Sequence, residues 1–247
     1  MALGLMIVGF LTPILIYAQN ANDDRKAKAF CNIILDLASK FDQRITNRDT
    51  KLEEKRTDIT ERIADRWSKR DVKLAEKRAK WDTNRDEHFA KLEEKTGTDK
   101  QEQALLVFKQ AVTDAIASRR LAIDAAIQAF RQDVEQAKTD RKTAVNELRN
   151  TFQNSIQATF EKAKTDCDAG VAPATIRTNF RAEVKAAKDK FESDRQEIEK
   201  LQTTMEALIN ARKEAIKKAI DDFKAAMETA RNDFKAVFPT ESTEGAD

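Results

Sequence analysis

The scarcity of helix-breaking residues restricts the fold of this chain more than any other feature of its sequence. Its 247 residues include only five Gly and three Pro. Three of these eight breakers lie within the first 18 residues, and the rest fall at three places: Gly97, Gly170 with Pro173, and Pro239 with Gly245. Because Pro and Gly are the residues least compatible with a helix interior, the sequence predicts three long helices over about residues 22–95, 99–168 and 175–237. A disordered tail is expected at 239–247.

The apolar residues of the first segment recur every eleven residues, as in the row formed by Phe30, Phe41, Leu52, Ile63 and Leu74. Eleven residues complete three turns, so a stripe of this period stays on one face of a nearly straight helix. The second segment repeats the pattern, and arginines fill gaps in the rows, which gives a 22-residue alternation of apolar and Arg layers. The predicted fold is therefore all-α: an elongated antiparallel three-helix coiled-coil bundle with an 11/22-residue (hendecad) repeat.

The register between the first two helices follows from matching their apolar rows. If the helices are antiparallel, residues at one level have numbers that add to about 197, and this register brings apolar residues together. It also sets Arg56 level with Arg141 and Arg78 with Arg119, so these guanidinium groups need carboxylates from neighbouring turns or from the third helix. The third helix fits less well, because its apolar phase slips by one residue near Gln202. The predicted core layers are Phe41, Ile45, Leu52, Ile63, Trp67, Leu74, Trp81, Phe89, Phe108, Ile123, Phe130, Val134, Val145, Phe152 and Ile156.

The two cysteines give a check on this register, because they were not used to set it. The numbers of Cys31 and Cys167 add to 198, so the same hairpin brings them to one level. A disulfide there would contribute about 4 to 5 kcal/mol in the chain-entropy model. Two buried free thiols are the alternative. Redox catalysis is not indicated, since the sequence has no C-x-x-C motif.

Residues 1–18 predict export. They are apolar except for Thr12 and Tyr17, are shorter than a transmembrane helix requires, and end at a junction after Ala18 that suits signal-peptide cleavage. The mature helical body would then be residues 19–238, located outside the cytoplasm or on the outer side of its membrane. The alternative is an uncleaved anchor that contacts the membrane through residues 1–18, with the body in the cytoplasm. The basic residues Arg25 and Lys26 after the run, with none before it, leave that alternative open.

The composition offers little material for an active site. The 45 basic and 43 acidic residues are interspersed, which does not favour nucleic acid as a partner. The single histidine, His88, is expected on the surface rather than as a metal ligand. The carboxylate pairs Glu53–Glu54 and Glu93–Glu94 are expected on charged helix faces with no cleft to desolvate them. The sequence therefore predicts no enzyme activity, cofactor, metal or small-molecule substrate.

Two further groups of side chains have alternative interpretations. Trp67 and Trp81 are expected as large core layers, and as exposed recognition aromatics only if the third helix leaves them uncovered. The Arg rows are expected to form structural ion pairs, with anion binding as the alternative.

Part of the chain resembles known families. The pattern Cys31-x-x-Ile34 and the run from Arg44 to Lys51, R-I-x-x-R-x-x-K, resemble uncharacterised exported helical proteins of candidate-phylum bacteria over about the first third of the chain. That resemblance implies export but no activity or site residues. The 11- and 22-residue segments also look like exchangeable apolipoproteins and desiccation-related hendecad proteins, although apolipoprotein repeats are punctuated by Pro. A leader followed by charged helices is similar to periplasmic Skp-type holdases, which carry a β-rich body that this sequence lacks.

The function predicted from these features is non-enzymatic. We expect an exported helical rod that acts as a spacer or scaffold at the cell envelope, with protein partners or self-association. The alternative is a carrier of lipids or hydrophobic clients, in which the apolar stripes open onto a membrane or an unfolded chain.

Overall fold

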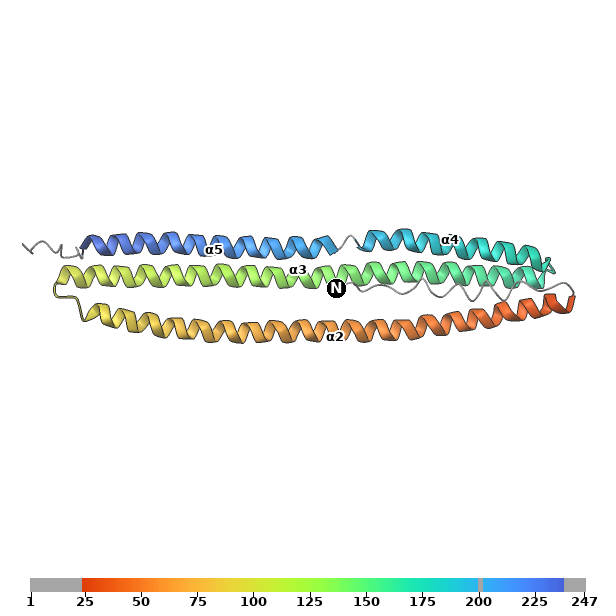
Figure 1. Ribbon diagram of the computed structural model, residues 1–247, viewed down its shortest axis with the longest axis horizontal. Coiled ribbons are helices and arrows are strands. Elements are labelled where there is room, and N and C mark those ends of the chain that lie inside the picture. The colour runs from red at the N-terminus through yellow and green to blue at the C-terminus, as the bar shows by residue number, and fades with distance from the viewer. Residues whose placement is uncertain (1–23, 200–201, 238–247) are drawn as a thin grey trace, which may run out of the picture. The chain divides into compact units, whose positions relative to one another are not determined.

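The computed structural model describes residues 24–199 and 202–237, and this part of the chain is all-α, without strands. The predicted leader at 1–18 and the predicted tail at 239–247 lie outside the described residues. None of the helices in the described ranges is long and apolar enough to cross a membrane. The helices are α2 (Asp24–Glu93), α3 (Asp99–Asp168), α4 (Pro173–Glu199) and α5 (Gln202–Val237) (Figure 1).

The turn between α2 and α3 occurs at the predicted break and carries its own capping contacts. The backbone N–H of Gln101 donates to Thr98 Oγ1 at 3.3 Å, and the backbone N–H of Gly97 donates to Gln101 Oε1 at 3.0 Å. Asp99 and Glu102 lie in the first turn of α3, where negative charge complements the helix dipole. Local sequence therefore fixes the start of α3 within a residue of its predicted position.

The turn between α3 and α4 is closed by a Schellman motif. Gly170 has a φ of 71°, the left-handed conformation that glycine adopts without a steric penalty. Its N–H donates to the carbonyl of Cys167, and the N–H of Val171 donates to that of Asp166, at 3.1 and 3.0 Å. The next helix begins at Pro173, two residues before the expected start, because proline is well suited to the first helical position.

The third predicted segment is described as two helices rather than one. α4 ends at Glu199 and α5 begins at Gln202, and residues 200 and 201 lie outside the described residues. The predicted one-residue phase slip of the apolar rows lies near Gln202, the first residue of α5. On a continuous helix such a slip would turn the apolar stripe by about 100° away from its partner.

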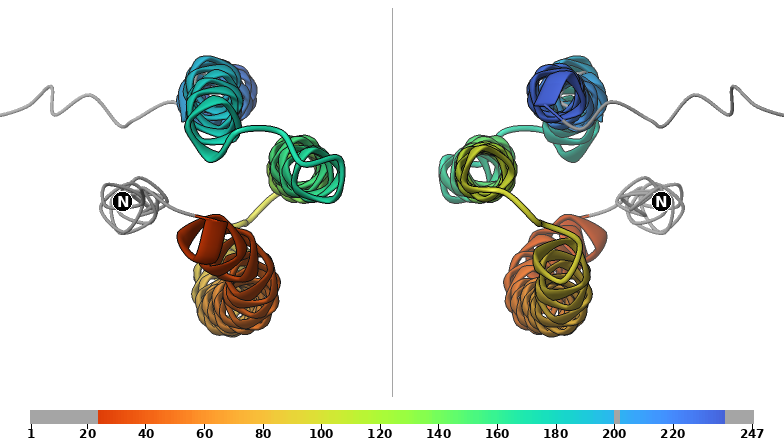
Figure 2. Two further views of the ribbon diagram at one scale, coloured as in Figure 1. Left: turned by 90° about the vertical axis from the view of Figure 1, so that its right-hand side faces the viewer. Right: turned by 90° about the vertical axis from the view of Figure 1, so that its left-hand side faces the viewer.

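The first of two compact units comprises residues 24–60 and 139–199. The start of α2, the second half of α3 and α4 share one hydrophobic core in this unit. Figure 2 shows these helices end on. Ile156 and Ile176 are each only 1% exposed. The other buried members are Phe30, Ile34, Leu148, Phe152, Phe160, Ala163, Phe180, Val184 and Phe191.

The second unit comprises residues 61–138 and 202–237. Here the second half of α2, the first half of α3 and α5 bury fewer and smaller side chains. The ring of Phe108 on α3 contacts both neighbouring helices, with centroids 6.3 Å from Phe89 and 4.8 Å from Phe234. The buried side chains of this unit are Leu105, Val112, Val134, Ala219 and Ala230.

The predicted core layers differ in how far the structure buries them. Val134, Phe152 and Ile156 are buried, whereas Trp81 is 51% exposed and is not a core residue. The prediction for Trp81 is wrong: the guanidinium of Arg119 on α3 lies 5.8 Å from the Trp81 ring centroid and 4.0 Å from that of Phe223 on α5, so a cation lies against the ring where an apolar side chain was expected. The remaining predicted residues are half-buried: Phe41, Ile45, Leu52, Ile63, Trp67, Leu74, Phe89, Phe108, Ile123, Phe130 and Val145.

Candidate functional site

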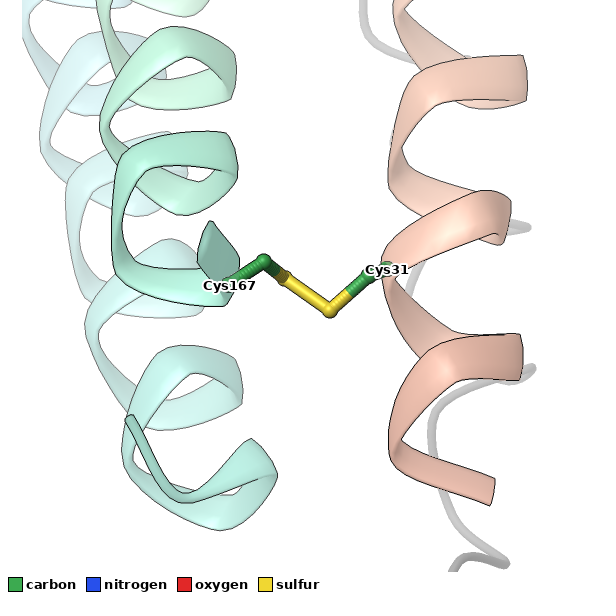
Figure 3. The surroundings of a disulfide bond; sticks show 2 residues. All are labelled: Cys31 and Cys167. Atoms are coloured by element: carbon green, nitrogen blue, oxygen red, sulfur yellow. A yellow bond between two sulfur atoms is a disulfide. The ribbon is translucent and has the colours of Figure 1, made fainter. Parts of the chain in front are cut away.

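The disulfide links α2 to α3 within the first unit. Cys31 and Cys167 are bonded, with their Cα atoms 6.1 Å apart, inside the usual range for disulfides (Figure 3). Both cysteines pack against the hydrophobic core of that unit. The predicted bond is therefore present in the structure. The bond covalently links two positions that are 136 residues apart in the sequence.

Interhelical ion pairs connect α2 and α3 in both units. In the second unit, Arg131 donates both terminal nitrogens to Asp71 at 2.6 and 2.9 Å, and Arg120 does the same to Asp82 at 2.7 and 3.0 Å. In these two carboxyl groups the hydrogen bonds from arginine, followed by the positive charge, hold the pKa below its usual range. In the first unit, Arg149 of α3 pairs with Asp49 of α2 at 2.7 Å, so an ion pair joins the same two helices there.

The arginines of the predicted Arg layers find partners one turn away from their own level. Arg56 donates to the amide oxygen of Asn146 at 3.2 Å and pairs with Glu53. Arg78 forms a two-pronged pair with Asp124 at 2.7 and 2.9 Å, which raises the pKa of this guanidinium. Neighbouring turns therefore supply the carboxylate and amide acceptors that the register requires.

Arg119 is held by aromatic rings instead of a carboxylate. Its guanidinium carbon lies 4.0 Å from the ring centroid of Phe223 on α5 and 5.8 Å from that of Trp81 on α2. Burial, and then the charges of Arg120 and Arg78, lower the pKa of Arg119. At this level of the second unit a cation thus occupies the place of an apolar core residue.

A cavity of about 640 Å³ lies among α2, α3 and α5 within the second unit, and we call it the α2–α5 groove. Its apolar lining comes from all three helices, and its charged lining is mainly basic. The apolar residues are Trp67, Leu74, Ile127, Phe130, Ile216 and Ile220, and the charged residues are Arg70, Asp71, Arg131, Arg212, Lys213, Lys217, Asp221 and Lys224.

The positive charge of the groove is only partly compensated. Asp71 is engaged by Arg131, and Asp221 by two lysines of its own helix at 3.2 and 3.5 Å. Within the described part of the chain, Arg70, Arg212 and Lys213 have no carboxylate partner. The groove therefore combines an apolar floor with cations that remain available to an acidic ligand.

Two arginines also form part of the groove floor. The guanidinium of Arg212 lies 4.2 Å from the ring centroid of Phe130, and that of Arg131 lies 5.2 Å from the ring centroid of Trp67. Trp67 is thus a half-buried groove residue as well as a predicted core layer. Cationic planes interrupt the apolar floor at both aromatic rings.

The remaining candidate residues lie on exposed helix surfaces. His88 is exposed, and the described residues contain no group of three or more potential metal ligands. Glu53 and Glu93 are exposed and pair with basic residues of their surroundings, and their neighbours Glu54 and Glu94 are exposed too. These carboxylates have the surroundings of helix-surface charges, as expected.

The groove is the feature that the sequence analysis did not anticipate. A closed bundle was expected, with the apolar rows of the third segment covering those of the first. The sequence does contain a signal, because Lys213, Lys217 and Lys224 border Ile216 and Ile220 on one helix face. Lysines at the border of an apolar stripe are typical of a face that meets a ligand or a surface.

Comparison with protein-family models, with curated proteins and with solved structures finds no match to this chain. The functional conclusions below therefore depend on its own residues.

Proposed function

We propose that this is a non-enzymatic structural or interaction protein, a helical spacer or scaffold at the cell envelope that acts through protein partners or self-association. The observation that carries the proposal is that arginine side chains connect the helices to one another. Arg120, Arg131 and Arg149 pair with carboxylates across the α2–α3 interface, and Arg119 stacks on aromatic rings of two other helices. These cations stabilise helix pairing, as a scaffold requires.

Export is the first testable part of this proposal. The apolar residues 1–18 support it, and so does the Cys31–Cys167 disulfide, because such bonds persist mainly in oxidising compartments. Mass spectrometry of the protein from its native host should find an N-terminus at Gln19 or within a few residues of it. Intact Met1 on protein from the cytoplasmic fraction would contradict export.

The elongated antiparallel three-helix coiled coil is the second part. Its support is local: α2 and α3 each contain 70 residues, and Phe89 contacts Phe108 at the predicted register. A straight helix of that length extends about 105 Å. Small-angle scattering should therefore give a maximum dimension of about 100 Å or more, and a value under about 70 Å would contradict the proposed rod.

The carrier hypothesis remains a second candidate because a specific observation favours it. The second unit contains the α2–α5 groove and several exposed apolar residues, including Val72, Trp81 and Leu121, which is 74% exposed. Flotation with phospholipid vesicles separates the two hypotheses. A scaffold should stay with the protein fraction, whereas strong flotation accompanied by a gain in helicity would favour the carrier.

A further inference from the structure

We infer that the α2–α5 groove binds an amphipathic α-helix of a partner protein, with acidic residues beside its apolar stripe. This inference rests on the proposed role as an interaction protein and adds the chemistry of the partner. The groove is open space between helices of one compact unit, and a further helix there would cover an apolar floor that the chain itself leaves half-buried.

The spacing of the apolar side chains suits a helix. Ile216 and Ile220 lie one turn apart on α5, and Trp67 and Leu74 lie two turns apart on α2, so they line opposite walls at helical intervals. The lining residues of α5 run from Arg212 to Lys224, which corresponds to a rise of about 18 Å or just over three turns of helix. Helix-in-groove recognition uses anchors at these intervals.

The positive charge of the lining indicates that the partner helix carries negative charge. Arg70 on one wall, and Arg212 and Lys213 on the other, have no carboxylate partner in the described residues, whereas both lining carboxylates are already paired. Glutamate or aspartate flanking the partner's apolar stripe would form charge-assisted hydrogen bonds with these cations. A basic or neutral helix would leave them uncompensated next to a newly desolvated floor.

The same lining favours a helix over an alkyl chain. Guanidinium groups lie against both Trp67 and Phe130, so a continuous hydrocarbon would meet polar edges in the middle of the floor. A helix can place acidic and apolar side chains in alternation and satisfy both. A second copy of this chain is a poor occupant, because its 45 basic and 43 acidic residues are interspersed along the sequence.

The test uses intrinsic fluorescence, because the chain contains only two tryptophans. In the full chain with Trp81→Phe, emission reports on Trp67 in the groove. The probes are three lactam-bridged helical peptides of about four turns with identical apolar residues and with Glu, Gln or Lys flanking them. We expect the Glu peptide to bind about tenfold or more tightly than the Gln peptide, and the Lys peptide not to bind.

Paired substitutions locate the binding. Ile220→Asp places a negative charge in the groove and should weaken the Glu peptide by about tenfold or more. Leu121→Asp, the matched control on a residue that does not line the groove, should change its affinity less than about twofold. The double variant Arg212→Gln/Lys213→Gln should weaken the Glu peptide and leave the Gln peptide unchanged. Circular dichroism checks that each variant keeps its helicity.

Several results would overturn the inference. One is binding of all three peptides with equal affinity, or of none below about 1 mM. Another is a stronger response of Trp67 to oleate or to phosphatidylglycerol vesicles than to the Glu peptide. A dimer in sedimentation equilibrium that Ile220→Asp dissociates and Leu121→Asp does not would assign the groove to a second copy. Each of these would leave the export and scattering tests of the proposed function unaffected, so the two failures are distinguishable.

Discussion

The two units differ in the side chains that their helices bury. In the first, α3 meets the large apolar side chains of α4, and Ile156 and Ile176 are almost completely buried. In the second, α3 meets α5, whose buried side chains are alanines, and Arg119 and Arg212 stack on aromatic rings between helices. The residues at the facing positions thus decide whether a layer becomes a sealed core or an open groove.

This difference in packing predicts a difference in stability between the two units. The first unit has a contiguous core and the disulfide, so it is expected to be the more stable of the two. The helices of the second unit are joined by ion pairs and cation–π contacts. Each of these contacts contributes less free energy of folding than the burial of one large apolar side chain. Both tryptophans, Trp67 and Trp81, lie in the second unit. Their fluorescence therefore reports on that unit alone, while far-ultraviolet circular dichroism reports on all helices.

Removal of the disulfide should have the largest effect and should act on the first unit. We expect Cys31→Ser/Cys167→Ser to lower the free energy of unfolding by up to about 4 to 5 kcal/mol, because the bond closes a long loop in the unfolded chain. Thermal unfolding by circular dichroism should shift more than unfolding by tryptophan fluorescence. Reductant should reproduce the shift in the wild type and leave the double variant unchanged. Equal shifts for both signals would show that the units do not differ in this way.

Truncation of matched isoleucines on α3 compares the two units directly. Ile123 and Ile156 belong to one row of the repeat, but Ile156 is buried and Ile123 is half-buried. Ile156→Ala should cost about 2 to 5 kcal/mol because it leaves a cavity in close-packed surroundings. Ile123→Ala should cost clearly less, because water already reaches its surroundings. Chemical denaturation measures both, and equal losses would contradict the contrast between a sealed and an open layer.

The interhelical arginine pairs of the second unit should contribute little individually. Arg120 and Asp82 keep about a quarter and a third of their side-chain surface exposed, at 25% and 33%. A double-mutant cycle with Arg120→Gln and Asp82→Asn should give a coupling of about 0.5 to 1 kcal/mol. The same cycle at 1 M salt should give a smaller value, since exposed charges are screened. A coupling well above 2 kcal/mol would mean that this pair carries far more of the unit's stability than its exposure indicates.

The sequence predicted the helices and the register better than it predicted the groove. Helix ends at Gly97 and Gly170 follow from local backbone chemistry, and the register follows from long apolar rows, so both are readable from the chain. The exposure of Trp81 depends on tertiary packing. It follows from the contact of Arg119 with Phe223, which takes the place of an apolar contact between helices. The phase slip near Gln202 is also readable from the chain, and it lies at the start of α5.

Acidification should weaken the second unit before the first, and this is the smallest expected effect per group. Hydrogen bonds from arginine lower the pKa of Asp71 and Asp82 in the second unit and of Glu53 in the first. A carboxyl group whose pKa is lower in the folded chain stabilises the fold above its unfolded value, near pH 4, and loses that contribution as the pH falls through the folded pKa. Because these groups are partly exposed, each contributes well under about 1 kcal/mol.

Arg131, the partner of Asp71, contacts Trp67. Arg120, the partner of Asp82, is the neighbour of Arg119, which contacts Trp81. We therefore expect tryptophan fluorescence to follow the titration of these two carboxyl groups. We expect the fluorescence change to be complete at a higher pH than the loss of helical circular dichroism, because the second unit unfolds first and the helices of the first unit, which keeps its core, still contribute to the dichroism signal. Asp82→Asn should reduce the acid dependence of the fluorescence signal. Coincident acid transitions, or fluorescence that stays native while helicity is lost, would reverse the proposed order of stability between the units.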